Sequence, residues 1–211
     1  MDSSSEAPLY DLNVYSPLVK VSGHSPRIKL SNIQLDMAHW CVFEHCEQAK
    51  HYLIKHGEKF DQECPIRTKK EHATHFMKYF RDWIEILKRE GSPFYCAELH
   101  SLARMPQSYV CYSQCYVNGV KFVVWDRDRK MKTQNSGVMV EDEDVTSYGV
   151  IQNIIQVQYA NGMLVVLFDC VWFNTDPTDR GSTKRDYGIL SVDTSTNWYE
   201  DWHCFRECPN E

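Results

Sequence analysis

Cysteine and histidine side chains, the residue types that bind zinc, concentrate in one short segment. This segment contains His39, Cys41, His45, Cys46, His51 and His56. A structural zinc site needs four converging ligands, which usually come from short paired spacings such as Cys-x-x-Cys. The sequence contains no Cys-x-x-Cys pair. We therefore expect neither a metal site nor a cofactor.

Nucleophilic catalysis has equally little support in the sequence. Cys111, Cys115 and Cys170 stand in apolar runs, where a cysteine acts as a small buried hydrophobe. No Gly-x-Ser-x-Gly, phosphate-binding loop or Gly-rich dinucleotide turn is present. The acidic run at 141–144 is typical of a solvated loop. We expect a protein that is not an enzyme.

A basic stretch is the first candidate binding site. Residues 121–134 contain only two aspartates but five cations, which are Lys121, Arg127, Arg129, Lys130 and Lys132. Trp125 stands among them. Cations beside an aromatic ring are typical of contacts to phosphates or to single-stranded nucleic acid. The alternative is a solvated loop after a hairpin.

Aromatic residues form the second candidate site. Four rings in the second half of the chain are candidates for a peptide-binding pocket: Trp125, Tyr148, Trp172 and Tyr187. Aromatic pockets on small β-domains bind peptides or methylated lysine. Core packing explains the same rings equally well, so both interpretations stay open.

Helices precede these sites along the chain. Apolar residues between Asp36 and His56 indicate one or two helical pieces, which Gly57 is expected to end. Thr68 and Glu71 form a capping box at the start of the clearest helix. Six large apolar residues then recur at helical spacing up to Leu87, and Gly91 supplies a stop.

Strands follow the helices. Asn118-Gly119 and Asn161-Gly162 each separate two β-prone runs, which predicts two hairpins, 109–125 and 148–173. A further strand is expected at 187–192. The fold class is therefore α+β, with an N-terminal arm and helices followed by a small antiparallel β-sheet or an SH3-like β-barrel.

These elements divide the chain of 211 residues into four parts. We expect a linker or extended arm at 1–35, a helical segment at 36–105, a β-domain at 106–201 and an atypical tail at 202–211. The net charge of −6 comes from the second half, so any nucleic-acid contact needs a local basic patch. No apolar run reaches membrane-spanning length and no signal peptide is recognisable, which indicates an intracellular protein without a membrane partner.

Two runs of sequence resemble a known family. Residues 133–138 (TQNSGV) and 167–173 (LFDCVWF) are similar to a domain of unknown function in plant CACTA transposon proteins of the En/Spm type. Weaker similarities lie at 38–43, 52–53, 56, 102–104, 118–122, 148–151, 154–155 and 186–188. The resemblance implies a non-catalytic accessory region, nuclear or cytoplasmic, with DNA or other transposon-encoded proteins as partners. It transfers no catalytic residue.

The end of the chain departs from the family pattern. After the 186–188 motif the family continues into an apolar segment and a closing strand, whereas this chain turns polar. A degenerate element copy without present function would look like this. A missing last strand would leave the apolar run 163–168 at a sheet edge, so we expect the chain to self-associate or to need a partner, and truncation after Trp198 to change this little.

Overall fold

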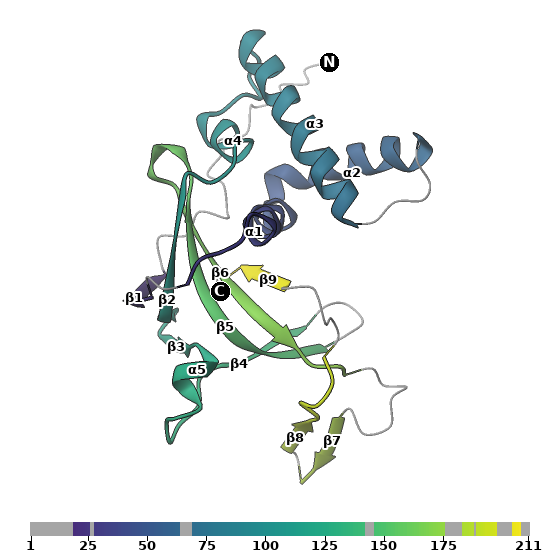
Figure 1. The fold of residues 1–211 in the computed structure, drawn as a ribbon. Helices are drawn as coiled ribbons and strands as arrows, with labels where there is room; N and C mark the ends of the chain where they lie inside the picture. The colour runs from purple at the N-terminus through teal and green to yellow at the C-terminus, as the bar shows by residue number, and fades with distance from the viewer. Residues whose placement is uncertain are drawn as a thin grey trace, which may run out of the picture. The chain divides into compact units, whose positions relative to one another are not determined.

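The computed structural model describes residues 19–25, 28–63, 69–141, 146–175, 183–187, 189–197 and 204–207. The chain divides into two compact units. The helical unit contains, of the described residues, 38–63, 69–109 and 157–165, and the sheet unit contains the others. The fold is α+β, as predicted, and Figure 1 shows its helices and strands. None of the described helices is both long and apolar enough to cross a membrane.

The described part of the helical unit contains four α-helices. They are α1 (Asn32–His45), of which the unit takes the residues from Ala38 on, α2 (Glu47–Glu63), α3 (Lys69–Arg89) and α4 (Ala97–Leu102). Aromatic rings on three of these helices pack edge to face: the Phe43 ring centroid lies 5.1 Å from that of Phe80, and Tyr52 lies 5.3 Å from Phe80. Such pairs add to the burial of large apolar side chains.

The predicted helix before Gly91 is confirmed as α3. Its residues Phe76, Phe80 and Ile84 are fully buried, as their helical spacing requires. Gly91 has a φ of +61°, and its N–H donates to the Lys88 carbonyl at 3.2 Å, so it ends the helix in the left-handed conformation. The expected capping box includes Thr68, which lies outside the described residues.

The two helical pieces expected near 36–56 are confirmed as α1 and α2, but the predicted end at Gly57 is wrong. Helix α2 continues through Gly57 to Glu63. Glycine inside a helix costs only about 1 kcal/mol. The packing of α2 on α3 outweighs this cost, because His56, next to Gly57, is 3% exposed and its ring lies 5.5 Å from Phe76.

A seven-stranded sheet forms the core of the sheet unit. The main path runs β1 (Lys20–His24), β2 (Ser108–Val117), β5 (Thr146–Gln158), β6 (Leu164–Trp172) and β9 (Cys204–Glu207). Strand β3 (Val120–Val123) pairs with β2, and β4 (Gly137–Glu141) pairs with β5. Strands β7 (Thr183–Asp186) and β8 (Ile189–Val192) form a separate hairpin, so the strand expected at 187–192 is confirmed as β8.

Both Asn-Gly hairpins are confirmed. Asn118 and Gly119 have φ angles of +49° and +82° between β2 and β3. Asn161 and Gly162 have φ angles of +62° and +75° between β5 and β6. These left-handed pairs match the twist of antiparallel strands, which is why Asn-Gly is favoured there.

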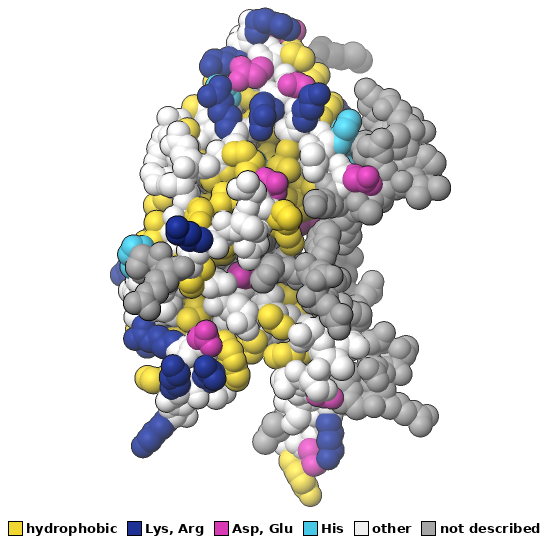
Figure 2. Space-filling model, viewed as in Figure 1, with side chains coloured by type: hydrophobic (Ala, Val, Ile, Leu, Met, Phe, Trp, Pro, Cys, Tyr) yellow, Lys and Arg dark blue, Asp and Glu magenta, His cyan; other side chains and the backbone are white. Residues whose placement is uncertain are grey.

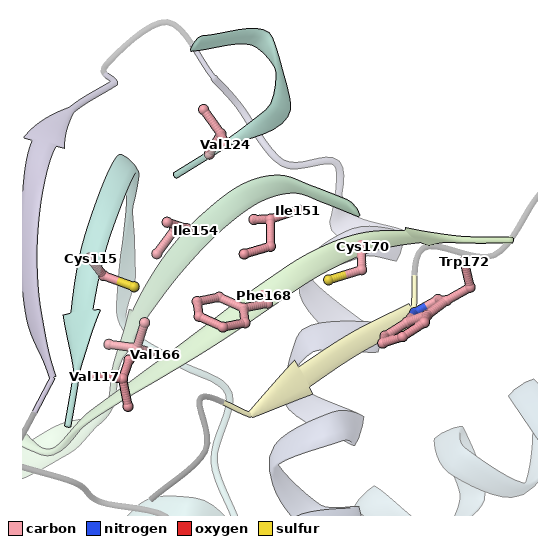
Figure 3. Close-up of a cluster of buried hydrophobic side chains, with 9 residues drawn as sticks. All are labelled: Cys115, Val117, Val124, Ile151, Ile154, Val166, Phe168, Cys170 and Trp172. Atoms are coloured by element: carbon pink, nitrogen blue, oxygen red, sulfur yellow. The ribbon is translucent and has the colours of Figure 1, made fainter. Parts of the chain in front are cut away.

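The sheet is open, and the SH3-like barrel is not formed. Among the described strands, the path from β1 to β9 has no pairing that joins its two ends. Strands β5 and β6 are curved (Figure 1), and the apolar core packs along them and their neighbours (Figure 3). Its members are Cys115, Val117, Val124, Ile151, Ile154, Val166, Phe168, Cys170 and Trp172.

The expected arm and the expected tail each contribute a strand to the seven-stranded sheet. Within the expected arm at 1–35, β1 pairs with β2, and Lys20 stands opposite Tyr116. Within the expected tail at 202–211, β9 pairs with β6 from Leu167 to Cys170. The β6 edge is therefore covered over these residues, and the expected reason for self-association is wrong.

Candidate functional site

The candidate nucleic-acid site lies in a loop between β3 and β4, at residues 124–135, which we call the basic loop. It contains the short helix α5 (Trp125–Asp128). Hydrogen bonds hold the two ends of the loop together. Val123 N–H, just before the loop, donates to the Asn135 carbonyl at 3.0 Å, and Asn135 N–H donates to the Asp128 carboxylate at 2.6 Å. These bonds fix the backbone at the base of the loop, from which its exposed side chains extend.

Asp128 is the internal support of the basic loop. Its side chain is 1% exposed, and its backbone carbonyl accepts from Met131 N–H at 2.8 Å. One carboxylate oxygen, Oδ2, takes the Asn135 bond, while the other, Oδ1, is buried without a hydrogen-bond partner in the described structure. Burying a carboxylate costs free energy. The bond from Asn135 N–H offsets part of this cost.

Four of the five predicted cations are brought together and face solvent. Arg127, Arg129, Lys130 and Lys132 are all exposed in the basic loop, and Figure 2 shows Lys and Arg side chains gathered over α5. Arg127 Nη1 donates to Ser113 Oγ at 3.0 Å, and Arg129 Nε lies 3.4 Å from Asp126 Oδ1. The fifth cation, Lys121, is half-buried in β3, outside the loop.

The four candidate peptide-binding rings lie on different elements and differ in exposure. Trp172 is 5% exposed in the sheet core (Figure 3), so it is a packing residue. Trp125 is partly exposed on α5, Tyr148 is half-buried in β5, and Tyr187 is fully exposed with a φ of +47° after β7. Two cavities of the helical unit, of about 440 and 270 Å³, are lined by other residues.

The members of the predicted cysteine and histidine cluster take part in several different contacts, of which one joins two members: Cys41 Sγ lies 3.5 Å from His45 Nδ1. His39 Nδ1 lies 2.8 Å from the Tyr159 hydroxyl, and His45 Nδ1 donates to the Cys41 carbonyl at 2.8 Å. Cys46 Sγ donates to Gln48 Oε1 at 3.5 Å. No group of three or more His, Cys, Asp or Glu with metal-binding geometry occurs in the described part of the chain.

The strand cysteines are buried thiols, as their apolar surroundings predict. Cys111, Cys115 and Cys170 are all buried. Burial, and to a smaller extent the charge of Asp169, raise the pKa of Cys111 to about 11. A thiol with such a pKa stays protonated near neutral pH and is a poor nucleophile. The acidic run at 141–144 lies outside the described residues from Asp142 on.

A chain of three imidazoles is the feature that the sequence did not predict. His56 Nδ1 lies 3.2 Å from His72 Nε2, and His56 Nε2 lies 2.9 Å from His75 Nδ1. The spacing of His72 and His75 on one helix face was visible in the sequence, but their meeting with α2 was not. The two contacts use opposite nitrogens of His56, so the three side chains do not converge on one metal position.

Comparison with known proteins identifies no relative: no protein-family model, curated protein or solved structure matches the chain.

Proposed function

We propose that this chain is a non-catalytic accessory module that binds nucleic acid through the basic loop. The main support for this proposal is that Arg127, Arg129, Lys130 and Lys132 are exposed on a loop whose ends are held together by hydrogen bonds. A loop whose ends are already held together loses less backbone freedom when its cations bind phosphates. The resemblance of 133–138 and 167–173 to plant CACTA transposon proteins supports a role in a transposition complex.

The charge of the loop surface favours an anionic partner although the chain is acidic overall. Of the two aspartates in the loop, Asp128 is buried, so only Asp126 offsets the four cations at the surface. An exposed ion pair such as Asp126–Arg129 contributes little and is easily exchanged for a phosphate contact. The electrostatic attraction is therefore local, as a protein of net charge −6 requires.

Apolar side chains in the same loop favour single-stranded over double-stranded nucleic acid. Trp125 is 36% exposed and Met131 is 56% exposed. An exposed tryptophan beside cations offers a stacking surface for an unpaired base, which contributes about 1–3 kcal/mol per base in known complexes. We expect the sequence preference to be weak, because stacking and phosphate contacts do not read base edges.

A salt-titrated binding assay with fluorescent single-stranded and duplex DNA and RNA tests the proposal. The combined change Arg127→Ala, Arg129→Ala, Lys130→Ala and Lys132→Ala should weaken binding, and the salt slope should fall by roughly 0.7 for each single-strand phosphate that the variant no longer neutralises. The matched control removes four exposed cations of the helical unit, Lys55, Lys78, Lys88 and Arg89. Equal losses of affinity in both variants, or no binding at low salt, would contradict the proposal.

Peptide binding is the second candidate function, and one observation in the helical unit favours it. The cavity of about 440 Å³ is lined by Trp40, Leu53, Ile54, Glu44 and His72. Ile54 is 62% exposed, so its apolar side chain is available to a partner at this cavity. The carboxylate of Glu44 at an apolar opening suits a segment with an apolar side chain next to Lys or Arg. Ile54→Glu should then abolish peptide binding and leave nucleic-acid binding unchanged.

A further inference from the structure

Three neighbouring strands of the sheet unit carry a row of side chains that the proposals above do not use. Strands β1 and β3 pair with opposite edges of β2, so β2 lies between them (Figure 1). Lys20 of β1 stands opposite Tyr116 of β2, and Lys121 of β3 stands opposite the same tyrosine. Residues in register on paired antiparallel strands have their side chains on the same face, about 5 Å apart. The row is therefore lysine, tyrosine, lysine.

The neighbouring rows show that this row faces away from the apolar core. Val21, Cys115 and Phe122 are in register with one another, and all three belong to the core or pack against it. Because side chains alternate between the two faces of a strand, the residues on either side of this core row lie on the opposite face. On that face Gln114 Nε2 donates to Ser22 Oγ at 2.7 Å, so the row beside the tyrosine is polar.

The lysine–tyrosine–lysine row is accessible and locally positive. Tyr116 is 40% exposed, Lys20 is exposed and Lys121 is half-buried. Within the described part of the chain, neither lysine forms an ion pair. The strands β1, β2 and β3 contain no Asp or Glu. In a protein of net charge −6, this surface therefore attracts an anionic partner locally.

The order of the three side chains matches one nucleotide of a single strand, in which a flat base lies between two phosphates. Neighbouring strands are about 4.8 Å apart, so the backbones of the two lysines are about 10 Å apart, one on each side of the tyrosine. Their flexible side chains carry compact charges that can reach phosphates on both sides of a stacked base. An acidic peptide lacks the base that would cover the ring, and in a duplex the faces of the bases are already stacked.

We propose that the face formed by Lys20, Tyr116 and Lys121, which we call the tyrosine face, binds an unpaired nucleotide of a single-stranded nucleic acid. The base stacks on Tyr116, and the two lysines contact the flanking phosphates. The inference rests on the proposed function for the class of ligand, but its residues lie outside the basic loop. Stacking tolerates every base, so we expect a preference for unpaired strands with little preference for sequence.

Oligonucleotides that keep every phosphate but lack the bases separate stacking from charge. Fluorescence anisotropy should show that Tyr116→Leu weakens binding of a short oligothymidylate at least about fivefold, the lower end of base–aromatic stacking. The same variant should bind an abasic strand of equal length as the wild type does. Tyr116→Phe keeps the ring and should bind both strands normally. Tyr187→Leu, the matched change at another exposed tyrosine, should alter neither affinity. Equal losses for both strands, or none, would overturn the proposal.

The two lysines are tested by the salt dependence of binding. The combined change Lys20→Gln and Lys121→Gln should lower the salt slope for a single strand by roughly 1.4, which is about 0.7 for each phosphate released. The matched control is Lys55→Gln with Lys78→Gln, two exposed lysines of the helical unit, and it should leave the slope unchanged. The same slope in both double variants would mean that the lysines do not contact phosphates.

Photocrosslinking tests the site without any substitution. A single strand containing 5-iodouracil should crosslink to Tyr116 in the full chain, as mapped by mass spectrometry. Polyglutamate should compete much less well than an oligonucleotide of the same charge; equal competition would indicate a general anion surface and overturn base stacking. Crosslinks confined to the basic loop, with normal binding by Tyr116→Leu, would overturn the tyrosine face alone. Normal binding by the basic-loop variant, with loss in Tyr116→Leu, would overturn the basic loop alone and support the tyrosine face.

Discussion

The Tyr159 hydroxyl lies 2.8 Å from His39 Nδ1, and both side chains are almost completely buried in the helical unit. The His39 ring also lies 4.7 Å from the Phe43 ring, so the imidazole has aromatic surroundings. Burial, helped by the positive charge of Arg81, lowers the pKa of His39 to about 3. The ring is therefore neutral in the folded protein at any pH above this value.

This pair predicts a loss of stability in mild acid. An unfolded His39 takes up a proton near pH 6.5, but the folded protein does not until about pH 3, so unfolding is favoured as the pH falls between these values. The contribution is at most about 1.4 kcal/mol per pH unit. Urea unfolding at pH 7.5, 6.0 and 5.0 measures it. His39→Gln should flatten the dependence, and an identical slope in both proteins would contradict the assignment.

Gly149 predicts a packing defect on substitution. A Cβ at this position in β5 would lie 2.6 Å from the Val171 carbonyl oxygen and 3.0 Å from the Trp172 ring. Gly149→Ala should therefore destabilise the protein by about 1–3 kcal/mol. Gly137 in the paired strand β4 has nothing within 4 Å of the same position, so Gly137→Ala is the matched control. Thermal unfolding of the two variants should differ clearly.

Because Asp128 is buried and accepts a hydrogen bond within the basic loop, we expect its substitution to lower the stability of the protein. Asp128→Ala leaves the Asn135 N–H without its acceptor and should cost about 1–3 kcal/mol. Asp128→Asn keeps an acceptor oxygen and removes the buried charge, so it should be milder. Asp126→Ala is the control, because its side chain is 84% exposed and its ion pair is at the surface. Denaturant unfolding compares the three, and equal effects would show that Asp128 does not support the loop.

The sequence predicts those elements whose cause is local. The Asn-Gly turns specify both hairpins because they accept two left-handed residues at little cost. The apolar spacing around Phe76 and Phe80 specifies α3, and Gly91 specifies its end. The basic loop also follows from composition, since its four exposed cations are neighbours in the chain.

Elements that depend on distant partners could not be predicted. Strands β1 and β9 are short, and pairing with β2 and β6 makes them strands. The contact of His56 with His72 and His75 exists only because α2 packs on α3. Likewise Tyr95, His100 and Glu85 look unrelated in the sequence and meet through the approach of α3 and α4.

Metal content provides a direct check on the histidine and cysteine side chains. The purified protein should contain less than one zinc per chain, and a chelator should not change its melting temperature. His39 and His45 are directed to other partners, and His56 uses both nitrogens for its two neighbours. Elemental analysis showing one tightly held zinc would contradict this and direct attention to His39, Cys41, His45 and Cys46.

The pairing of β9 with β6 predicts the effect of shortening the chain. Truncation after Trp198 removes β9 and exposes the backbone N–H and C=O groups of β6 from Leu167 to Cys170. The run 163–168 beside it is apolar and β-prone, so the new edge is a template for pairing with another copy. The truncated protein should self-associate with increasing concentration, whereas the intact protein should not do so through this edge.

Sedimentation velocity over a range of concentrations measures the difference. Truncation after Glu207 is the matched control, because it shortens the chain and keeps β9. Lys substitution at Leu164, which is 38% exposed at the start of β6, should suppress association of the protein truncated after Trp198, since a charge on an edge strand disfavours pairing. If both truncated proteins stay monomeric at all concentrations, the edge of β6 does not need β9 to prevent its pairing with another copy.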